Sequence, residues 1–117
     1  MVMLMKVKLE EGLMPQQQNN TILLLSPKMF FLDALQSKMV ETGIKVNIPS
    51  GYMGYITSTK GLRNVGIMIE GLLDEWYHDE VQILMFNASR SRKIFARGDP
   101  LALIKIVPCT SVSLEQA

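Results

Sequence analysis

The sequence has one cysteine, one histidine and one tryptophan in 117 residues. Cys109 cannot form a disulfide within its own chain, so we expect a reducing, intracellular compartment, the cytoplasm or the nucleus. His78 has carboxylates beside it but no second imidazole or thiol, and a single histidine among exposed carboxylates is typical of a solvated turn. We therefore predict no metal ligands in this chain.

The sequence also has no large excess of charge and no long apolar run. Twelve lysines and arginines face eleven aspartates and glutamates, a net charge of +1, which gives no general attraction to nucleic acid or to a membrane surface. No apolar run approaches the roughly 20 residues that cross a bilayer. The start, residues 1–11, contains lysines and no small-residue cleavage site, so it does not resemble a signal peptide. We expect neither a membrane nor a nucleic-acid partner.

What is present is a pattern of short strands. With 48% hydrophobic and 20% charged residues, the chain has the composition of one globular domain with its own core. Apolar and polar residues alternate in residues 5–9 and 44–48, and short apolar runs fill residues 21–25 and 67–69. The largely apolar residues 101–107 are interpreted as a further strand, which Pro108 ends. Residues 81–86 are apolar on both faces, which predicts a strand buried on both sides. Frequent glycine and proline turn signals between these segments favour an all-β barrel or sandwich.

Two segments are harder to assign. Residues 28–41 ("KMFFLDALQSKMVE") have apolar spacing that fits a helix of about three turns. Because every other segment is typical of β structure, we expect strand or loop in residues 29–41 and no long helix. The polar run "PQQQNN", residues 15–20, is interpreted as a loop.

Four stretches, in this order and near this spacing, resemble the trimeric dUTPase family. They are "MKVKLEEGLMP", "TGIKVNIPSGYMGYI", "GLLDEWYHDEVQILMFN" and "GDPLALIKIVP", and together they run from about Met5 to Pro108. The resemblance implies a distorted jelly-roll β barrel, assembled as a homotrimer with its sites at subunit interfaces. The expected division is a dUTPase-like domain over residues 1–110 and a short tail over residues 111–117.

The third stretch contains the main candidate site. The resemblance implies that Asp74 is the base that deprotonates the attacking water and that Tyr77 packs under the deoxyribose. It also implies that the backbone of Gly71 and Leu72 holds the uracil ring. A carboxylate at the tip of a rigid hairpin can act as a base at neutral pH. The alternative is that Asp74 is a turn residue, whose side chain bonds the local backbone.

The phosphate-binding motifs of the family are largely replaced. Leu23 takes the place of the aspartate that holds the hydrated Mg²⁺. Thr59 and Lys60 replace an arginine and a serine that grip the phosphates, and Leu103 replaces a glutamine. Residues 111–117 lack the glycine-rich fifth motif that closes over the triphosphate. Lys60 remains a candidate phosphate contact, because its ammonium group offers a single positive charge where the family has the planar guanidinium group of an arginine.

Three functions follow from this pattern. The first is a dUTPase-like protein that has lost efficient dUTP hydrolysis and serves as a trimeric binding or interaction module, for a deoxynucleotide or a protein partner. Such degenerate copies are typical of viruses that have captured a fold. The alternative is a divergent dUTP nucleotidohydrolase with Asp74 as its base, and only this activity would need Mg²⁺. The third is a nucleotide binder without turnover.

Overall fold

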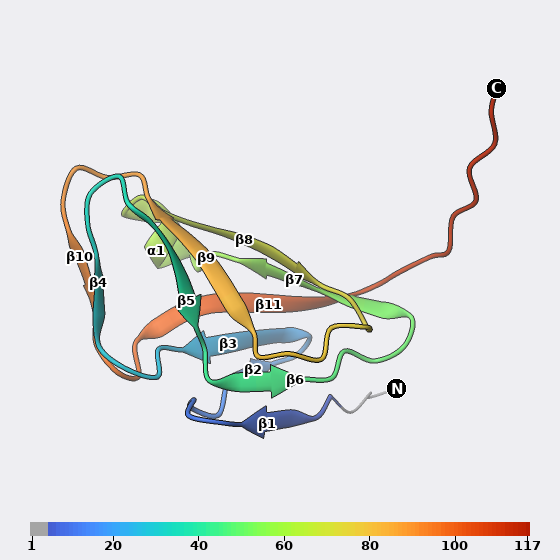
Figure 1. Ribbon diagram of the computed structural model, residues 1–117, viewed down its shortest axis with the longest axis horizontal. Coiled ribbons are helices and arrows are strands. Elements are labelled where there is room, and N and C mark those ends of the chain that lie inside the picture. Colours follow the sequence, from blue (N-terminus) through green and yellow to red (C-terminus); the bar gives the residue numbers. More distant parts are fainter. Residues whose placement is uncertain (1–4) are drawn as a thin grey trace.

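Eleven strands and one short helix make up the computed structural model, which describes residues 5–117. The first four residues, part of the N-terminal stretch and of the predicted domain, lie outside the described range. Figure 1 shows the elements in order. They are β1 (Val7–Leu9), β2 (Gln16–Gln18), β3 (Thr21–Leu25), β4 (Phe30–Leu32), β5 (Ser37–Glu41), β6 (Ile44–Val46), β7 (Tyr52–Thr57), α1 (Lys60–Asn64), β8 (Ile67–Leu73), β9 (Gln82–Asn87), β10 (Lys93–Phe95) and β11 (Pro100–Pro108).

The strands form one large antiparallel sheet and two small ribbons. The sheet has seven strands in the order β2-β3-β11-β7-β8-β9-β5, and the ribbons pair β1 with β6 and β4 with β10. In Figure 1 the β4–β10 ribbon stands at one end of the sheet and the β1–β6 ribbon runs along its lower side. The predicted all-β architecture is confirmed.

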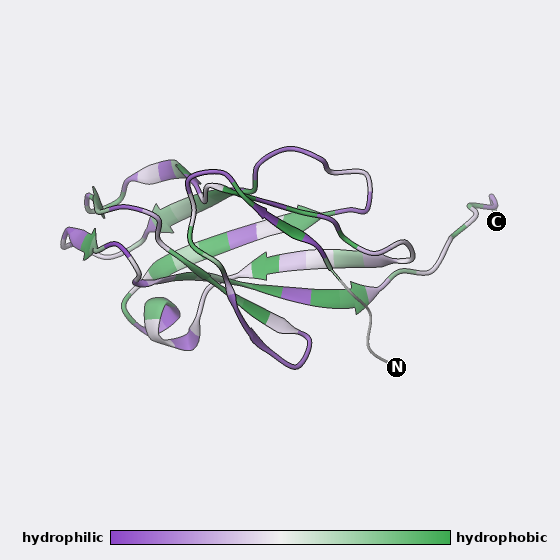
Figure 2. Ribbon diagram, turned by 90° about the horizontal axis from the view of Figure 1, so that it is seen from below, coloured by the Kyte–Doolittle hydropathy of each residue, from purple (hydrophilic) through white to green (hydrophobic). Residues whose placement is uncertain are grey.

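The core lies on one face of the large sheet, because its strands alternate buried and outward residues. In β3, Ile22 and Leu24 are buried, whereas their neighbours are only partly covered. Each fully buried leucine or isoleucine contributes about 1.5–3 kcal/mol relative to an exposed one. Figure 2, which is coloured by hydropathy, shows the strands green over much of their length with shorter purple segments, so apolar residues dominate them. The fully buried apolar residues include Leu24, Leu32, Ile44, Ile56, Ile67, Ile83, Met85, Leu101 and Ile104.

The prediction that residues 81–86 are buried on both sides is wrong for the single chain. Ile83 and Met85 are buried, but Leu84 is 51% exposed and Phe86 is 37% exposed. The pattern is the strict alternation of a strand with one covered face. No element of the described chain covers the outer face of β9, so its apolar residues meet solvent in the isolated chain.

The absence of a long helix in residues 29–41 is confirmed. The segment forms β4 and β5 with a turn between them, in which the Gln36 N–H donates to the Asp33 carbonyl over 3.1 Å. Phe30 and Leu32 are buried and Phe31 between them is exposed, which is the period of a strand. The apolar spacing that fits a helix therefore arises from two short strands in succession.

The interpretation of residues 15–20 as a loop is wrong in part. Gln16–Gln18 form β2, which pairs with β3 across a tight turn at Asn19, whose φ is 55°. Asparagine adopts this left-handed conformation more readily than most residues. The glutamine side chains are exposed, so the strand depends on backbone pairing to β3. The pattern of side chains in residues 16–18 therefore does not predict a strand.

The short helix α1 was not expected. It begins after Thr59, whose Oγ1 accepts a hydrogen bond from the Leu62 N–H over 3.1 Å, and it ends before Gly66, whose φ is 89°. A threonine cap and a following glycine with positive φ are recognisable helix boundaries. With five residues α1 cannot cross a membrane, and no other helix is present in residues 5–117 to do so.

Candidate functional site

The turn between β8 and β9 contains Asp74. The Tyr77 N–H donates to the Asp74 carbonyl over 3.2 Å, and Asp74 Oδ1 accepts from the Trp76 N–H over 2.9 Å. The carboxylate therefore stabilises its own turn, as the alternative interpretation expects. Its second oxygen, Oδ2, accepts no hydrogen bond from residues 5–117 and the side chain is exposed. One oxygen thus orients the group and the other is free to accept a proton.

Tyr77 lies on the same turn and faces inward. Its ring packs against the core, and its hydroxyl donates to the Glu80 carbonyl over 2.6 Å. Burial raises the pKa of Tyr77 above its usual value of 10.0, and the negative charges of Asp79 and Glu80 raise it further. The hydroxyl therefore stays protonated at neutral pH, and the ring has a fixed position beside Asp74.

The turn is held to the body of the domain where it returns to β9. Val81 is fully buried, and its N–H donates to the Ile44 carbonyl over 2.9 Å. Its own carbonyl accepts from the Thr42 N–H over 3.2 Å and from Thr42 Oγ1 over 2.6 Å. Leu73 is buried at the other end of the turn. Because both ends are anchored, Asp74 and Tyr77 lie on a rigid element.

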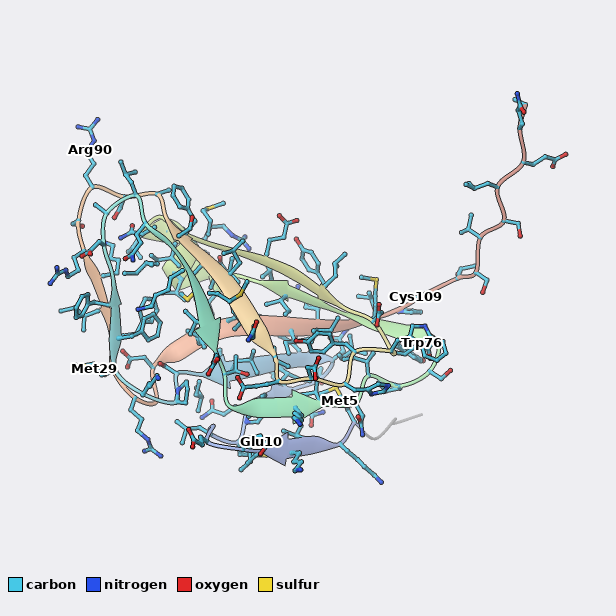
Figure 3. All side chains as sticks on the ribbon, in the orientation of Figure 1. Met5, Glu10, Met29, Trp76, Arg90 and Cys109 are labelled. Atoms are coloured by element: carbon cyan, nitrogen blue, oxygen red, sulfur yellow. The ribbon has the colours of Figure 1, made fainter. Side chains whose placement is uncertain are left out.

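Gly71 and Leu72 lie on β8 just before this turn. Gly71 pairs with Ile56, and a Cβ at Gly71 would lie 3.3 Å from the Ile56 Cδ1, a tight contact that favours glycine there. Leu72 and Trp76 are largely exposed, Trp76 to 75%, and Trp76 marks the tip of the turn in Figure 3. The candidate residues of the third stretch are therefore together, with an exposed apolar rim.

Lys60 does not join them. It is the first residue of α1, which precedes β8, whereas Asp74 follows β8. A strand of seven residues spans about 20 Å, and Figure 1 shows α1 and the β8–β9 turn at opposite ends of β8. A site that uses both Lys60 and Asp74 must combine two chains.

Two of the positions that the family resemblance assigns to metal or phosphate binding are direct neighbours in the sheet. Leu103 on β11 lies opposite Leu23 on β3 and, on its other side, opposite Thr57 on β7. The three side chains share the outer face, because the adjacent residues Ile22 and Ile104 are buried in the core. The sequence motifs present these positions separately, and the strand pairing brings them into one row.

This row does not fit a protein-held Mg²⁺ ion. Mg²⁺ binds through oxygen, and the side chains of Leu23 and Leu103 offer none. Within residues 5–117, no group of three or more histidines, cysteines, aspartates or glutamates is placed to hold a metal ion. The polar groups that this chain offers for chemistry are therefore those of the β8–β9 turn, Asp74 and Tyr77.

Arg63, a residue that the sequence interpretation missed, lies beside this row. Its Nη2 donates to Thr57 Oγ1 over 3.2 Å and to the Ser58 carbonyl over 3.3 Å. A motif search overlooks it, because the basic residue comes from the end of α1 and not from the motif itself. The capping signal at Thr59 was the available clue, since a helix beginning there turns Arg63 back toward β7.

Solved structures with the same fold include phage dUTPases. The dUTPase of Staphylococcus bacteriophage 80alpha matches with a TM-score of 0.89 and 21% identity, over 97% of this chain and 96% of that one. A mutant dUTPase from phage phi11 of S. aureus matches with a TM-score of 0.86 and 23% identity over the same shares. At these identities the likeness shows the fold.

Similar sequences include proteins named deoxyuridine 5'-triphosphate nucleotidohydrolase. One from Gloeobacter violaceus is 34% identical over 77 residues, 62% of this chain and 52% of that protein. One from Wolbachia pipientis wMel is 36% identical over 85 residues, 69% of this chain and 56% of that protein. The chain thus spans about half the length of these relatives. The family model described as dUTPase matches residues 13–117, nearly the whole chain, and the protein therefore belongs to the dUTPase family.

Proposed function

We propose that the chain is a divergent dUTP nucleotidohydrolase, which converts dUTP to dUMP and diphosphate at a site shared between two copies. The observation that carries this proposal is the rigid β8–β9 turn. It presents a free carboxylate oxygen of Asp74 beside the fixed ring of Tyr77. The activity named for the similar sequences supports the choice of substrate.

In the proposed reaction Asp74 acts as the general base. Oδ2 accepts a proton from water while Oδ1 keeps its bond to the Trp76 N–H, so the carboxylate stays oriented. The hydroxide adds to the α-phosphorus, the bond from this phosphorus to the bridging oxygen breaks, and diphosphate leaves. The Tyr77 ring packs under the deoxyribose, and the Gly71–Leu72 backbone binds the uracil. Positioning supplies much of the rate in such reactions.

We expect turnover to be slow. Leu23 and Leu103 offer neither charge nor hydrogen bonds to a triphosphate, and the Thr59 hydroxyl already caps α1. Losing one well-placed donor can lower kcat by on the order of 100-fold. Lys60 supplies a point charge only. A turnover number below about 1 per second, the low end of typical enzymes, is the expected result.

Replacing Asp74 with asparagine tests the base. The introduced amide keeps an oxygen that can accept from the Trp76 N–H, so the turn is retained, but it cannot take a proton from water. We expect diphosphate release from dUTP to fall about 100-fold or more, as general-base catalysis contributes on that order. Asp79→Asn makes the same chemical change in the same turn and is expected to retain the rate. An Asp74→Asn variant as active as the parent would rule out the proposed base.

A homotrimer is the expected assembly. Lys60 and Asp74 lie at opposite ends of β8, so a complete site needs a second copy. The outer face of β8 and β9 exposes Met68, Leu84 and Phe86, apolar surface of the kind that subunit contacts cover. Light scattering is expected to give a mass three times that of the chain. A stable monomer at micromolar concentration would contradict both the assembly and the shared site.

A second candidate is a trimeric binding or interaction module without turnover. The row of Leu23 and Leu103 favours it, because the outer sheet face is apolar where the family resemblance implies phosphate contacts. A degenerate copy of this kind would bind a deoxynucleotide or a protein partner. The Asp74→Asn experiment separates the two functions. No diphosphate release above the variant's background, together with unchanged trimer mass, is the result expected of the module.

A further inference from the structure

We infer that Arg63 is a phosphate contact of this site, a role that the family motifs give to other positions. The inference rests on the proposed function, since it concerns the same nucleotide. Arg63 would replace part of the charge lost at Thr59, Leu23 and Leu103. Its suitability depends on the donors that remain on the guanidinium, on its place on the sheet, and on the charge around it.

The guanidinium of Arg63 is oriented but not saturated. Its Nη2 donates to Thr57 Oγ1 over 3.2 Å and to the Ser58 carbonyl over 3.3 Å. The three remaining N–H groups, on Nη1 and Nε, have no hydrogen-bond partner in residues 5–117. The side chain is exposed. A planar guanidinium group that is held along one edge and free along the other is suited to bind phosphate oxygens.

The position of the guanidinium group matches the face that the nucleotide would use. Thr57, its hydrogen-bond partner, lies opposite Leu103, and Leu103 lies opposite Leu23. Neighbouring strands are about 4.8 Å apart, so Arg63 lies one to two strands from the replaced phosphate positions. Arg63 and Thr57 also line a hollow of about 380 Å³ on this outer face, bordered by Tyr55 and Glu70. Its apolar side is made of Met68, Leu84 and Phe86, the surface expected to meet a second copy, so the hollow lies at the expected subunit boundary. The hollow gives the phosphates a place beside the guanidinium group.

The charged residues around the hollow leave Arg63 as the positive charge that a phosphate there would meet. Glu70 pairs across the strands with Thr57 and lines the same hollow, so its carboxylate opposes an incoming phosphate. No ion pair within 4.0 Å joins Arg63 to Glu70 among the described residues, which leaves the guanidinium available. Arg63 is the one basic side chain among the residues described as lining this hollow. Removing Glu70's charge should therefore strengthen phosphate binding, and removing Arg63's should weaken it.

A structural role for Arg63 is the competing explanation. The residue stands in the last turn of α1, where a cation is favourable, and its Nη2 bonds tie α1 to β7. Loss of such a tie would loosen the site for every ligand equally. A phosphate contact changes only the binding of ligands that carry the phosphates. Deoxyuridine and a triphosphate analogue of dUTP, imido-bridged and not hydrolysed, therefore distinguish the two roles.

The experiment measures the affinity of both probes by calorimetry on the full chain. Arg63→Ala is expected to weaken binding of the analogue about 10- to 100-fold, the range for hydrogen bonds to a charged group, and to leave deoxyuridine binding unchanged. Arg63→Lys, which keeps the charge and loses the planar guanidinium group, should fall between parent and Arg63→Ala. Glu70→Gln should bind the analogue more tightly. Arg90→Ala removes the same charge from a loop where the side chain points away from the body of the molecule, and it should change neither probe (Figure 3).

Equal losses for deoxyuridine and the analogue in Arg63→Ala would overturn the inference in favour of a structural role. If that variant is unstable, Arg63→Lys and Glu70→Gln decide, and unchanged analogue affinity in both would overturn it as well. Failure of the proposed hydrolysis gives a different result. In that case the parent releases no diphosphate but still binds the analogue through Arg63. A parent that binds no analogue overturns both proposals.

Discussion

Replacing Gly43 with alanine is expected to destabilise the protein by about 2–5 kcal/mol, which is a large part of the stability of a domain this size. Gly43 has a φ of 72°, a conformation costly for a residue with a Cβ. A Cβ there would lie 2.6 Å from the Gly12 Cα and closer still to its nitrogen. The Gly43 carbonyl also accepts from the N–H groups of Glu10 and Gly12, over 2.8 and 2.9 Å, so the two backbones cannot separate without losing bonds.

Gly51→Ala is the matched control for this variant. Gly51 has a similar φ of 83°, but a Cβ there would meet nothing within 4 Å. It should cost only the conformational part, about 1–2 kcal/mol. Urea unfolding followed by circular dichroism measures both. Equal destabilisation by the two variants would show that the close approach of Gly12 and Gly43 contributes nothing.

Asn87→Ala is expected to cost about 3–5 kcal/mol, because several buried polar groups lose their partner together. Asn87 is fully buried at the end of β9. Its Nδ2 donates to the Leu32 carbonyl over 3.0 Å and to the Ser91 carbonyl over 2.9 Å. Its Oδ1 accepts from the N–H and the hydroxyl of Ser89, over 3.0 and 2.7 Å. This one amide joins β4, the end of β9 and the loop before β10.

The control is Asn47→Ala, an exposed asparagine for which a change within about 0.5 kcal/mol is expected. Hydrogen exchange adds a local measurement. In Asn87→Ala the loop before β10 should exchange faster, because Ser89 and Ser91 lose their anchor. A loss below about 1 kcal/mol would mean that water or a shifted Ser89 satisfies the Leu32 carbonyl in place of the amide.

The sequence predicts strands well where one face of the strand is buried. Ile44 and Val46 are buried on either side of Lys45, as the alternation of apolar and polar residues there predicts. The long helix over residues 29–41 was excluded by the β character of the other segments, because the local apolar spacing fits a helix. Gln16–Gln18 have no such alternation, since their strand depends on backbone bonds to β3. The error at β9 arises because apolar residues stand on both faces of that strand. An apolar side chain can be buried, but Leu84 and Phe86 become buried only if another chain covers them.

The sequence likewise predicts the positions of some candidate site residues and not of others. Asp74 and Tyr77 are three residues apart in one turn, so a local motif places both correctly on the same turn. Lys60 belongs to another end of the molecule, and nothing local in the sequence reveals that distance. Arg63 was missed because its contact with Thr57 depends on how α1 returns against β7. Pairing between distant segments is what the sequence pattern does not contain.

The exposed tip of the β8–β9 turn has a practical consequence. Trp76 is the only tryptophan of the chain, two residues from Asp74 and 75% exposed. Light absorbed at the long-wavelength edge of indole absorption is therefore emitted from this turn alone, with no background from the core. The wavelength of that emission depends on how far the indole ring is exposed to water, so the unlabelled protein has an intrinsic fluorescent probe at its candidate site. Titrating either a nucleotide or the protein's own concentration against emission wavelength would then report events at a single, known position.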